Sequence, residues 1–174
     1  MRTARIIVRV RSLLPTALAA ALLLPPLASA AVDKGTFAPG VGGSGVTLGM
    51  ARAQVVARLG KPLYANANGY LQFSSKSLFD VYLDGSRRVR LIGISGPGFC
   101  TAFGACALTT GGIAKLRARY GARLRLTTLP ETGDRVWILL GTRGGKQVFT
   151  SFAPANARAT SPFIQVFIGY GNGR

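Results

Sequence analysis

The absence of histidine limits the chemistry that this chain can perform. Histidine is the commonest general base and a frequent zinc ligand, so the usual Ser-His-Asp and Cys-His catalytic arrangements and most zinc hydrolase sites are excluded. The remaining candidates for acid–base catalysis are five carboxylates, namely Asp33, Asp80, Asp84, Glu131 and Asp134. A serine–lysine arrangement at Ser75-Lys76 is also conceivable, but this dipeptide lies in a predicted loop.

The spacing of the carboxylates does not match that of a catalytic pair. Asp80 and Asp84 are four residues apart, which on a strand separates them by about 13 Å, more than glycosidases use. Asp84 also begins an Asp-Gly-Ser hairpin turn, and Glu131 and Asp134 flank Gly133 in a second predicted turn. We therefore expect a protein that is not an enzyme, with no catalytic residues, no cofactor and no metal. A hydrolase of unrecognised type is the alternative to a protein without catalytic activity.

The chain has two cysteines, Cys100 and Cys106, with five residues between them. A redox pair usually has two intervening residues at the start of a helix, and a zinc site would need further cysteines or histidines. In an oxidising compartment the spacing predicts a structural disulfide, with free thiols as the alternative.

The first 30 residues have the composition of a removable export signal. Four arginines precede an apolar run over residues 13–24, which is followed by two prolines and by Ala28-Ser29-Ala30. A membrane-spanning helix would need about 20 apolar residues, and this run has 12. The pattern predicts a Sec-type signal peptide over residues 1–30 and a protein that is secreted or located in the periplasm or cell envelope.

The mature chain is expected to be strongly basic. Removal of the signal takes away four arginines and leaves 18 basic residues against five acidic ones, a formal net charge of +13. Such a charge favours an acidic protein or an anionic envelope polymer as partner, with at most peripheral contact to a membrane. We expect no nucleic-acid partner, because the protein is exported and no nucleic-acid-binding motif is present.

Beyond the signal, we expect a glycine-rich flexible lead-in over residues 31–45 and a single α+β domain over residues 46–174. The domain is predicted to contain two tandem units, at about residues 46–96 and 107–170. Each unit begins with a short helix, over residues 51–59 and 112–120, which is closed by Gly60 and Gly121 respectively. Strand patterns follow in each unit, at residues 70–74, 78–83 and 89–94 and at residues 123–129, 135–140, 147–152 and 163–168.

Helices with one apolar stripe and half-buried strands predict an antiparallel sheet with short helices packed on one face. The opposite face would then be open to solvent. Along the predicted strands, aliphatic residues alternate with aromatic, basic or polar ones, and we expect the latter to lie on the open face. These candidate binding residues are Tyr82, Arg88, Arg90, Trp137, Phe149, Phe163, Gln165 and Phe167. The alternative is that the aromatic residues form a second small core.

The helix region of the first unit carries a family resemblance. Gly49-Met50, Val55, Leu59-Gly60 and Pro62 resemble the helix segment of the BamE (SmpA/OmlA) family, and two such units in tandem are similar to the β-lactamase inhibitory proteins. The resemblance implies a helix-plus-antiparallel-sheet module that binds protein or envelope partners without chemistry. The chain has no cysteine at the predicted cleavage point, so the lipid anchor of BamE is not implied.

These observations predict an exported, non-catalytic binding module for an anionic envelope component or a protein partner. The alternative is a secreted proteinaceous inhibitor of an extracellular hydrolase.

Overall fold

The computed structural model describes residues 32–75, 79–156 and 161–171. The predicted signal peptide lies outside these residues. Strands account for 47% of the structure and helices for 15%, and the strands form two sheets. The expectation of an α+β fold with helices packed on one sheet is therefore wrong.

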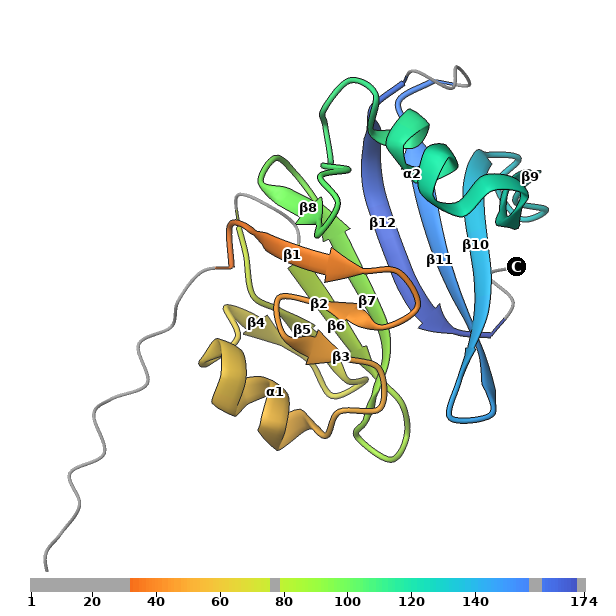
Figure 1. Cartoon of the computed structure of the whole chain (residues 1–174). Helices are drawn as coiled ribbons and strands as arrows, with labels where there is room; N and C mark the ends of the chain where they lie inside the picture. Colours follow the sequence, from red (N-terminus) through yellow and green to blue (C-terminus); the bar gives the residue numbers. More distant parts are fainter. Residues whose placement is uncertain (1–31, 76–78, 157–160, 172–174) are drawn as a thin grey trace, which may run out of the picture.

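The larger sheet is antiparallel and has eight strands (Figure 1). The first half contains β4 (Tyr64–Ala65), β5 (Tyr70–Gln72), β6 (Phe79–Leu83) and β7 (Val89–Ser95). The second half contains β9 (Leu124–Thr128), β10 (Arg135–Arg143), β11 (Lys146–Pro154) and β12 (Phe163–Tyr170). The halves join where β7 pairs with β12, so the order is β4-β5-β6-β7-β12-β11-β10-β9.

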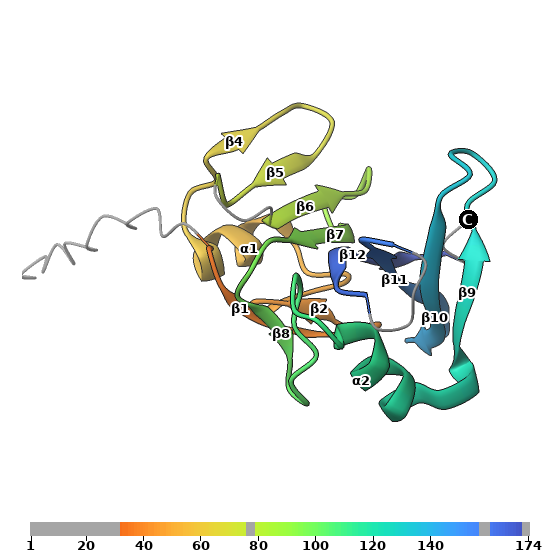
Figure 2. The same ribbon diagram turned by 90° about the horizontal axis from the view of Figure 1, so that it is seen from above.

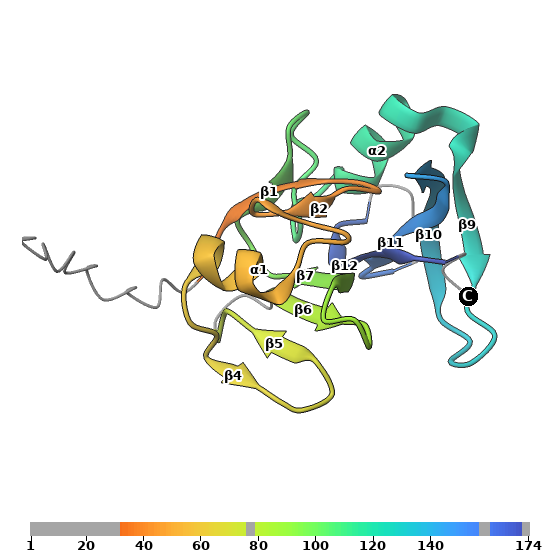
Figure 3. The same cartoon turned by 90° about the horizontal axis from the view of Figure 1, so that it is seen from below.

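The smaller sheet has the order β3-β2-β1-β8 and lies over one face of the larger sheet (Figures 2 and 3). Its strands are β1 (Gly35–Ala38), β2 (Gly42–Gly43), β3 (Val46–Thr47) and β8 (Phe99–Thr101), with β1 parallel to β8. The glycine-rich stretch expected to be a flexible lead-in thus supplies two strands. At Gly43 an added Cβ would lie 2.7 Å from Ile94 Cδ1, so the missing side chain allows the two sheets to approach closely.

The structure has two α-helices, α1 (Arg52–Leu59) and α2 (Gly112–Tyr120), and a 3-10 turn η1 (Gly121–Arg123). Each α-helix precedes one half of the larger sheet in the chain. Figure 2 shows α2 on the same side of the larger sheet as β1, β2 and β8. One face of the larger sheet is therefore covered jointly by a second sheet and by helix α2. In the described part of the chain, neither helix is long and apolar enough to span a membrane.

The core lies between these layers and forms one connected cluster. Phe37 of β1 contacts Phe152 of β11 and Phe163 of β12, with ring centroids 6.4 and 6.2 Å apart. Phe79 of β6 stacks on Phe99 of β8 at 5.8 Å. All five rings are at most 3% exposed, so aromatic packing joins the smaller sheet to both halves of the larger one.

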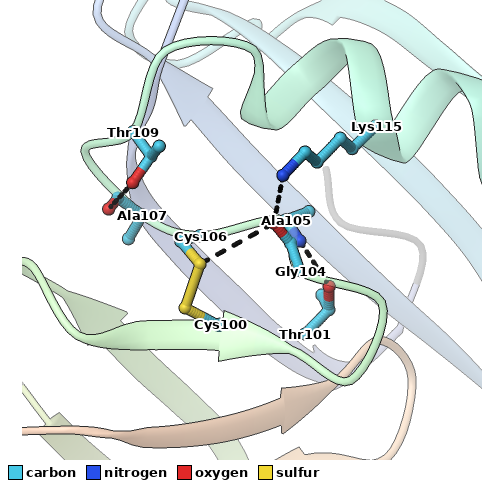
Figure 4. Close-up of a disulfide and its surroundings, with 8 residues drawn as sticks. All are labelled: Cys100, Thr101, Gly104, Ala105, Cys106, Ala107, Thr109 and Lys115. Atoms are coloured by element: carbon cyan, nitrogen blue, oxygen red, sulfur yellow. Dashed lines mark hydrogen bonds between the residues drawn. A yellow bond between two sulfur atoms is a disulfide. The ribbon is translucent and has the colours of Figure 1, made fainter.

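The predicted disulfide between Cys100 and Cys106 is present (Figure 4). It closes the loop that leaves β8, and the same loop is held by Lys115 of α2, whose Nζ donates to the Gly104 carbonyl over 2.9 Å. The Thr101 hydroxyl also accepts from the Ala105 N–H at 3.0 Å. The disulfide thus fixes the segment that connects the smaller sheet to α2.

Replacement of Gly43 by alanine tests the close approach of the two sheets. The new Cβ would meet Ile94 Cδ1 at 2.7 Å and Phe37 Cβ at 3.3 Å, so we expect a loss of about 1–3 kcal/mol in the free energy of unfolding. Urea denaturation measures this loss. Gly85→Ala is the matched control, because nothing lies within 4 Å of its added Cβ. Equal stability of the two variants would contradict the packing described.

Replacement of both cysteines by serine tests the role of the disulfide. Loss of this small loop closure is expected to lower the free energy of unfolding by about 2 kcal/mol on the chain-entropy estimate. Denaturation in the presence and absence of reductant measures the effect. Reductant should destabilise the native protein and leave the double variant unchanged; a native protein insensitive to reductant would contradict the assignment.

Candidate binding face

The second face of the larger sheet is not covered by any element in the described parts of the chain (Figures 2 and 3). Side chains alternate between faces along a strand, so residues between core positions point to this side. We call it the open face; its residues include Tyr70, Asp80, Tyr82, Leu91, Ile138, Leu140, Phe149, Ser151, Gln165 and Phe167. The strand pairings align them in rows across both halves of the sheet.

Tyrosines surround a buried carboxylate in the first half of the open face. The Tyr70 hydroxyl donates to Asp80 Oδ1 over 3.0 Å, and the Tyr70 ring lies 5.2 Å from that of Tyr82 and 5.8 Å from that of Tyr64. Asp80 is only 4% exposed, although it is on the open face. The phenol groups therefore form a layer above a carboxylate that a partner cannot contact directly.

Burial changes the acid–base properties of this cluster. Desolvation raises the pKa of Asp80, while the hydrogen bond from Tyr70 acts in the opposite direction. Desolvation and the neighbouring Asp80 raise the pKa of Tyr70 to about 12, and the same two causes raise the pKa of Tyr82. Both phenols are therefore neutral hydrogen-bonding groups at physiological pH.

Two glycines at the centre of the sheet lie beneath aromatic rings. An added Cβ at Gly93 would lie 3.3 Å from Phe167 Cε1, and one at Gly169 would lie 2.8 Å from Phe149 Cε1 and 2.7 Å from Leu91 Cδ1. The rings of Phe167 and Phe149 thus lie against backbone on β7 and β12, where the two halves meet. This packing gives the middle of the open face an apolar surface of half-buried aromatic side chains.

The open face is hollowed in its second half. A hollow of about 500 Å³ lies between β10, β11 and β12 and the neighbouring loops. Its apolar lining includes Val136, Pro154, Ile164 and Phe167, and its polar lining includes Ser151 and Gln165. Val136 is buried but lies outside the main core cluster, which agrees with its place on this face. The hollow has the mixed lining expected of a site for an apolar side chain with polar neighbours.

The structure brings together four of the eight residues expected on an open face. Tyr82, Phe149, Gln165 and Phe167 all lie there and are half-buried. Arg90 is exposed at the margin of this face. Tyr82 pairs with Leu91 and Leu83 pairs with Val89, so a register shift leaves Arg90 as an extra residue with no partner on β6. Arg88 is exposed in the adjoining turn, where its Nη1 donates to the Gly49 carbonyl over 3.0 Å.

Two expected residues lie on the covered face instead. Phe163 is fully buried in the core because a register shift beside Pro154 makes Ile164 the extra residue and reverses the facing of Phe163. Ile164 is accordingly 42% exposed. Trp137 pairs with Phe152 on the core side, where Arg117 lies 5.4 Å from its ring centroid. We exclude both residues from the candidate site.

The open face also contains residues that the sequence analysis did not select. Tyr70, Leu91, Ile138 and Leu140 are members of the same rows. Alternation within residues 135–140 could have indicated Ile138 and Leu140. Leu91 follows the irregularity at Arg90, so period-two counting places it on the wrong face.

Two carboxylates accept hydrogen bonds that hold local structure. Asp84 Oδ1 accepts from the backbone N–H groups of Ser86 and Arg88 at 2.9 and 3.0 Å, which identifies it as a turn residue. Asp33 Oδ1 accepts from the Ser74 hydroxyl at 2.8 Å. Within the described residues, no cluster of three or more potential metal-ligating side chains occurs.

No family model, curated protein or solved structure matches this chain. The resemblance to the BamE family and to the β-lactamase inhibitory proteins is therefore a hypothesis based on a few residues.

Titration of the tyrosines tests the Tyr70–Asp80 contact. We expect Tyr70 to ionise at about pH 12, and Asp80→Asn to lower its pKa towards 10 because the neighbouring negative charge is removed. The folded state then binds more protons than the unfolded state between about pH 10 and 12, so stability falls as the pH rises through this window. Tyrosinate absorbance, with Tyr70→Phe to identify the signal and circular dichroism to monitor folding, measures the pKa. A Tyr70 that ionises near pH 10 in the native protein would contradict the contact.

Proposed function

We propose that this protein is an exported, non-catalytic binding module that holds a protein partner on the open face. The proposal depends chiefly on one observation: a row of half-buried aromatic side chains lies on a sheet face that no described element covers. Phe149, Phe167 and Tyr82 lie at its centre, where both halves of the sheet contribute. Soluble proteins expose contiguous patches of this kind mainly at interaction sites.

The side chains of the open face are those that give most energy at protein interfaces. Tyrosines and arginines are enriched among binding hot spots, and tyrosine rings lose little conformational freedom on binding. The rings here are already packed against Gly93 and Gly169, so they are ordered before a partner arrives. The hollow beside Phe167 would accept an apolar side chain of the partner.

The charge distribution favours an acidic partner. Arg90 and Arg125 are exposed at the margins of the open face, whereas Asp80 is buried and Asp134 is exposed at the rim of the hollow. A formal net charge of +17 for the whole chain, or +13 without the predicted signal peptide, would accelerate encounter with an acidic surface. The arginines would thus set partner choice and association rate, while the aromatic side chains would provide most of the affinity.

The curvature of the sheet favours a second candidate within the same class of interaction. Figures 2 and 3 show β4–β5 and β9–β10 projecting on either side of the open face. A sheet whose two ends project in this way could hold a protruding loop of another protein, as an inhibitor of an extracellular hydrolase would do. Inhibition of a hydrolase recovered as the partner, lost on substitution of Phe167, would distinguish this candidate from simple binding.

Capture of partners with single-residue variants tests the proposal. We expect immobilised native protein to retain a partner from culture supernatant or envelope extract, and Phe167→Ala to retain at least tenfold less, because a hot-spot ring costs roughly 2 kcal/mol or more on truncation. Phe103→Ala is the matched control, since Phe103 is also part-exposed but lies in the disulfide loop, where its ring contacts Tyr120 of α2. Retention should also decrease as salt rises from about 50 to 500 mM. Equal retention by both variants would contradict the role of the open face.

A further inference from the structure

The two outer edges of the larger sheet are unequal. At one edge β4 contains only Tyr64 and Ala65. At the other edge β9 extends over five residues, Leu124–Thr128, and pairs with β10 without a register shift. No proline interrupts β9, and no strand in the described part of the chain pairs with its outer side. An edge of this length is a template for a further strand.

The hydrogen bonding of β9 identifies the groups that its outer edge presents. The Leu129 N–H donates to the Asp134 carbonyl on the β10 side, in register with the β9–β10 ladder. Inward and outward groups alternate along an antiparallel strand, so Arg125 and Thr127 also bond to β10. Leu126 and Thr128 consequently direct their N–H and C=O groups away from the sheet.

The side chains along β9 specify the chemistry of an added strand. Arg125 is exposed on the open face, and Arg123 is exposed immediately before the strand. On the covered side Leu124 is buried and Leu126 packs against the core cluster. A fitting strand would therefore alternate acidic residues on the Arg125 side with aliphatic residues on the Leu126 side.

A second copy of this chain fits the edge poorly. Antiparallel pairing of β9 with its own copy would bring two strands with arginines at positions 123 and 125 together, and like charges across a strand pair are destabilising. Charge complementarity instead selects an acidic segment of another protein.

We propose that the outer edge of β9 binds an extended acidic–aliphatic peptide segment by adding it to the eight-stranded sheet. Backbone hydrogen bonds to Leu126 and Thr128 would provide sequence-independent affinity, and Arg123 and Arg125 would select acidic segments. This site shares Arg125 with the margin of the open face but none of its aromatic side chains, so truncation of Phe167 can remove the open-face function without removing strand addition.

Labelled peptides of about nine residues test this proposal by fluorescence anisotropy. The first probe alternates valine with glutamate, and the second alternates valine with lysine. The third is the valine–glutamate probe with prolines at its centre. We expect the first probe to bind roughly tenfold or more tightly than either of the others, and to slow amide hydrogen exchange at Leu126 and Thr128. Equal binding of the proline probe would overturn strand addition, because a surface that attracts only charge does not require free backbone N–H groups.

Matched variants localise the binding. Arg125→Glu should weaken binding of the valine–glutamate probe at least tenfold, whereas Arg52→Glu makes the same charge change at an exposed position of α1, away from β9, and should have little effect. Equal loss in both variants, or slowed exchange at Leu126 that depends on protein concentration without peptide, would overturn the proposal. The latter result would identify a second copy as the occupant. Phe167→Ala should leave peptide binding intact, so failure here is distinguishable from failure of the open-face function.

Discussion

The close packing of the smaller sheet on one face of the larger sheet determines the rest of the structure. Gly43 lacks the side chain that would collide with Ile94, and Phe37 packs on Phe152 and Phe163 in the second half of the larger sheet. Because the smaller sheet and α2 cover one face, most of the aliphatic side chains of β6, β7 and β12 are directed there. The other face carries aromatic and polar side chains together with Leu91, Ile138 and Leu140, and these constitute the candidate binding surface.

Glycine also shapes the open face. At Gly93 and Gly169 the missing side chains allow the rings of Phe167 and Phe149 to approach the backbone of the sheet closely. The aromatic surface is thereby fixed by backbone packing and not by a second hydrophobic layer. Rigid rings of this kind lose little entropy on binding, which makes the centre of the open face well suited to recognition.

The sequence predicted the disulfide, both helices, the hairpins and the facing of Tyr82, Gln165 and Phe167, because these depend on local spacing and alternation. It did not predict the smaller sheet, because two of its strands contain only two residues each and because β1 pairs with the distant β8, neither of which produces a periodic pattern in the sequence. The facing of Phe163 was wrong for a related reason: the register shift at Pro154 is set by pairing with β11 and interrupts period-two counting. The close approach of the two sheets depends on Gly43, and this role can be recognised only when its neighbour Ile94 is known.

Hydroxyl-radical footprinting of the aromatic side chains tests most directly whether one face of the larger sheet is open. The account predicts rapid oxidation of Tyr82, Phe149 and Phe167, and protection of Phe37, Phe152 and Phe163, in the native protein. Protection of the first group to the same extent as the second would show that the open face is covered, and would contradict the account.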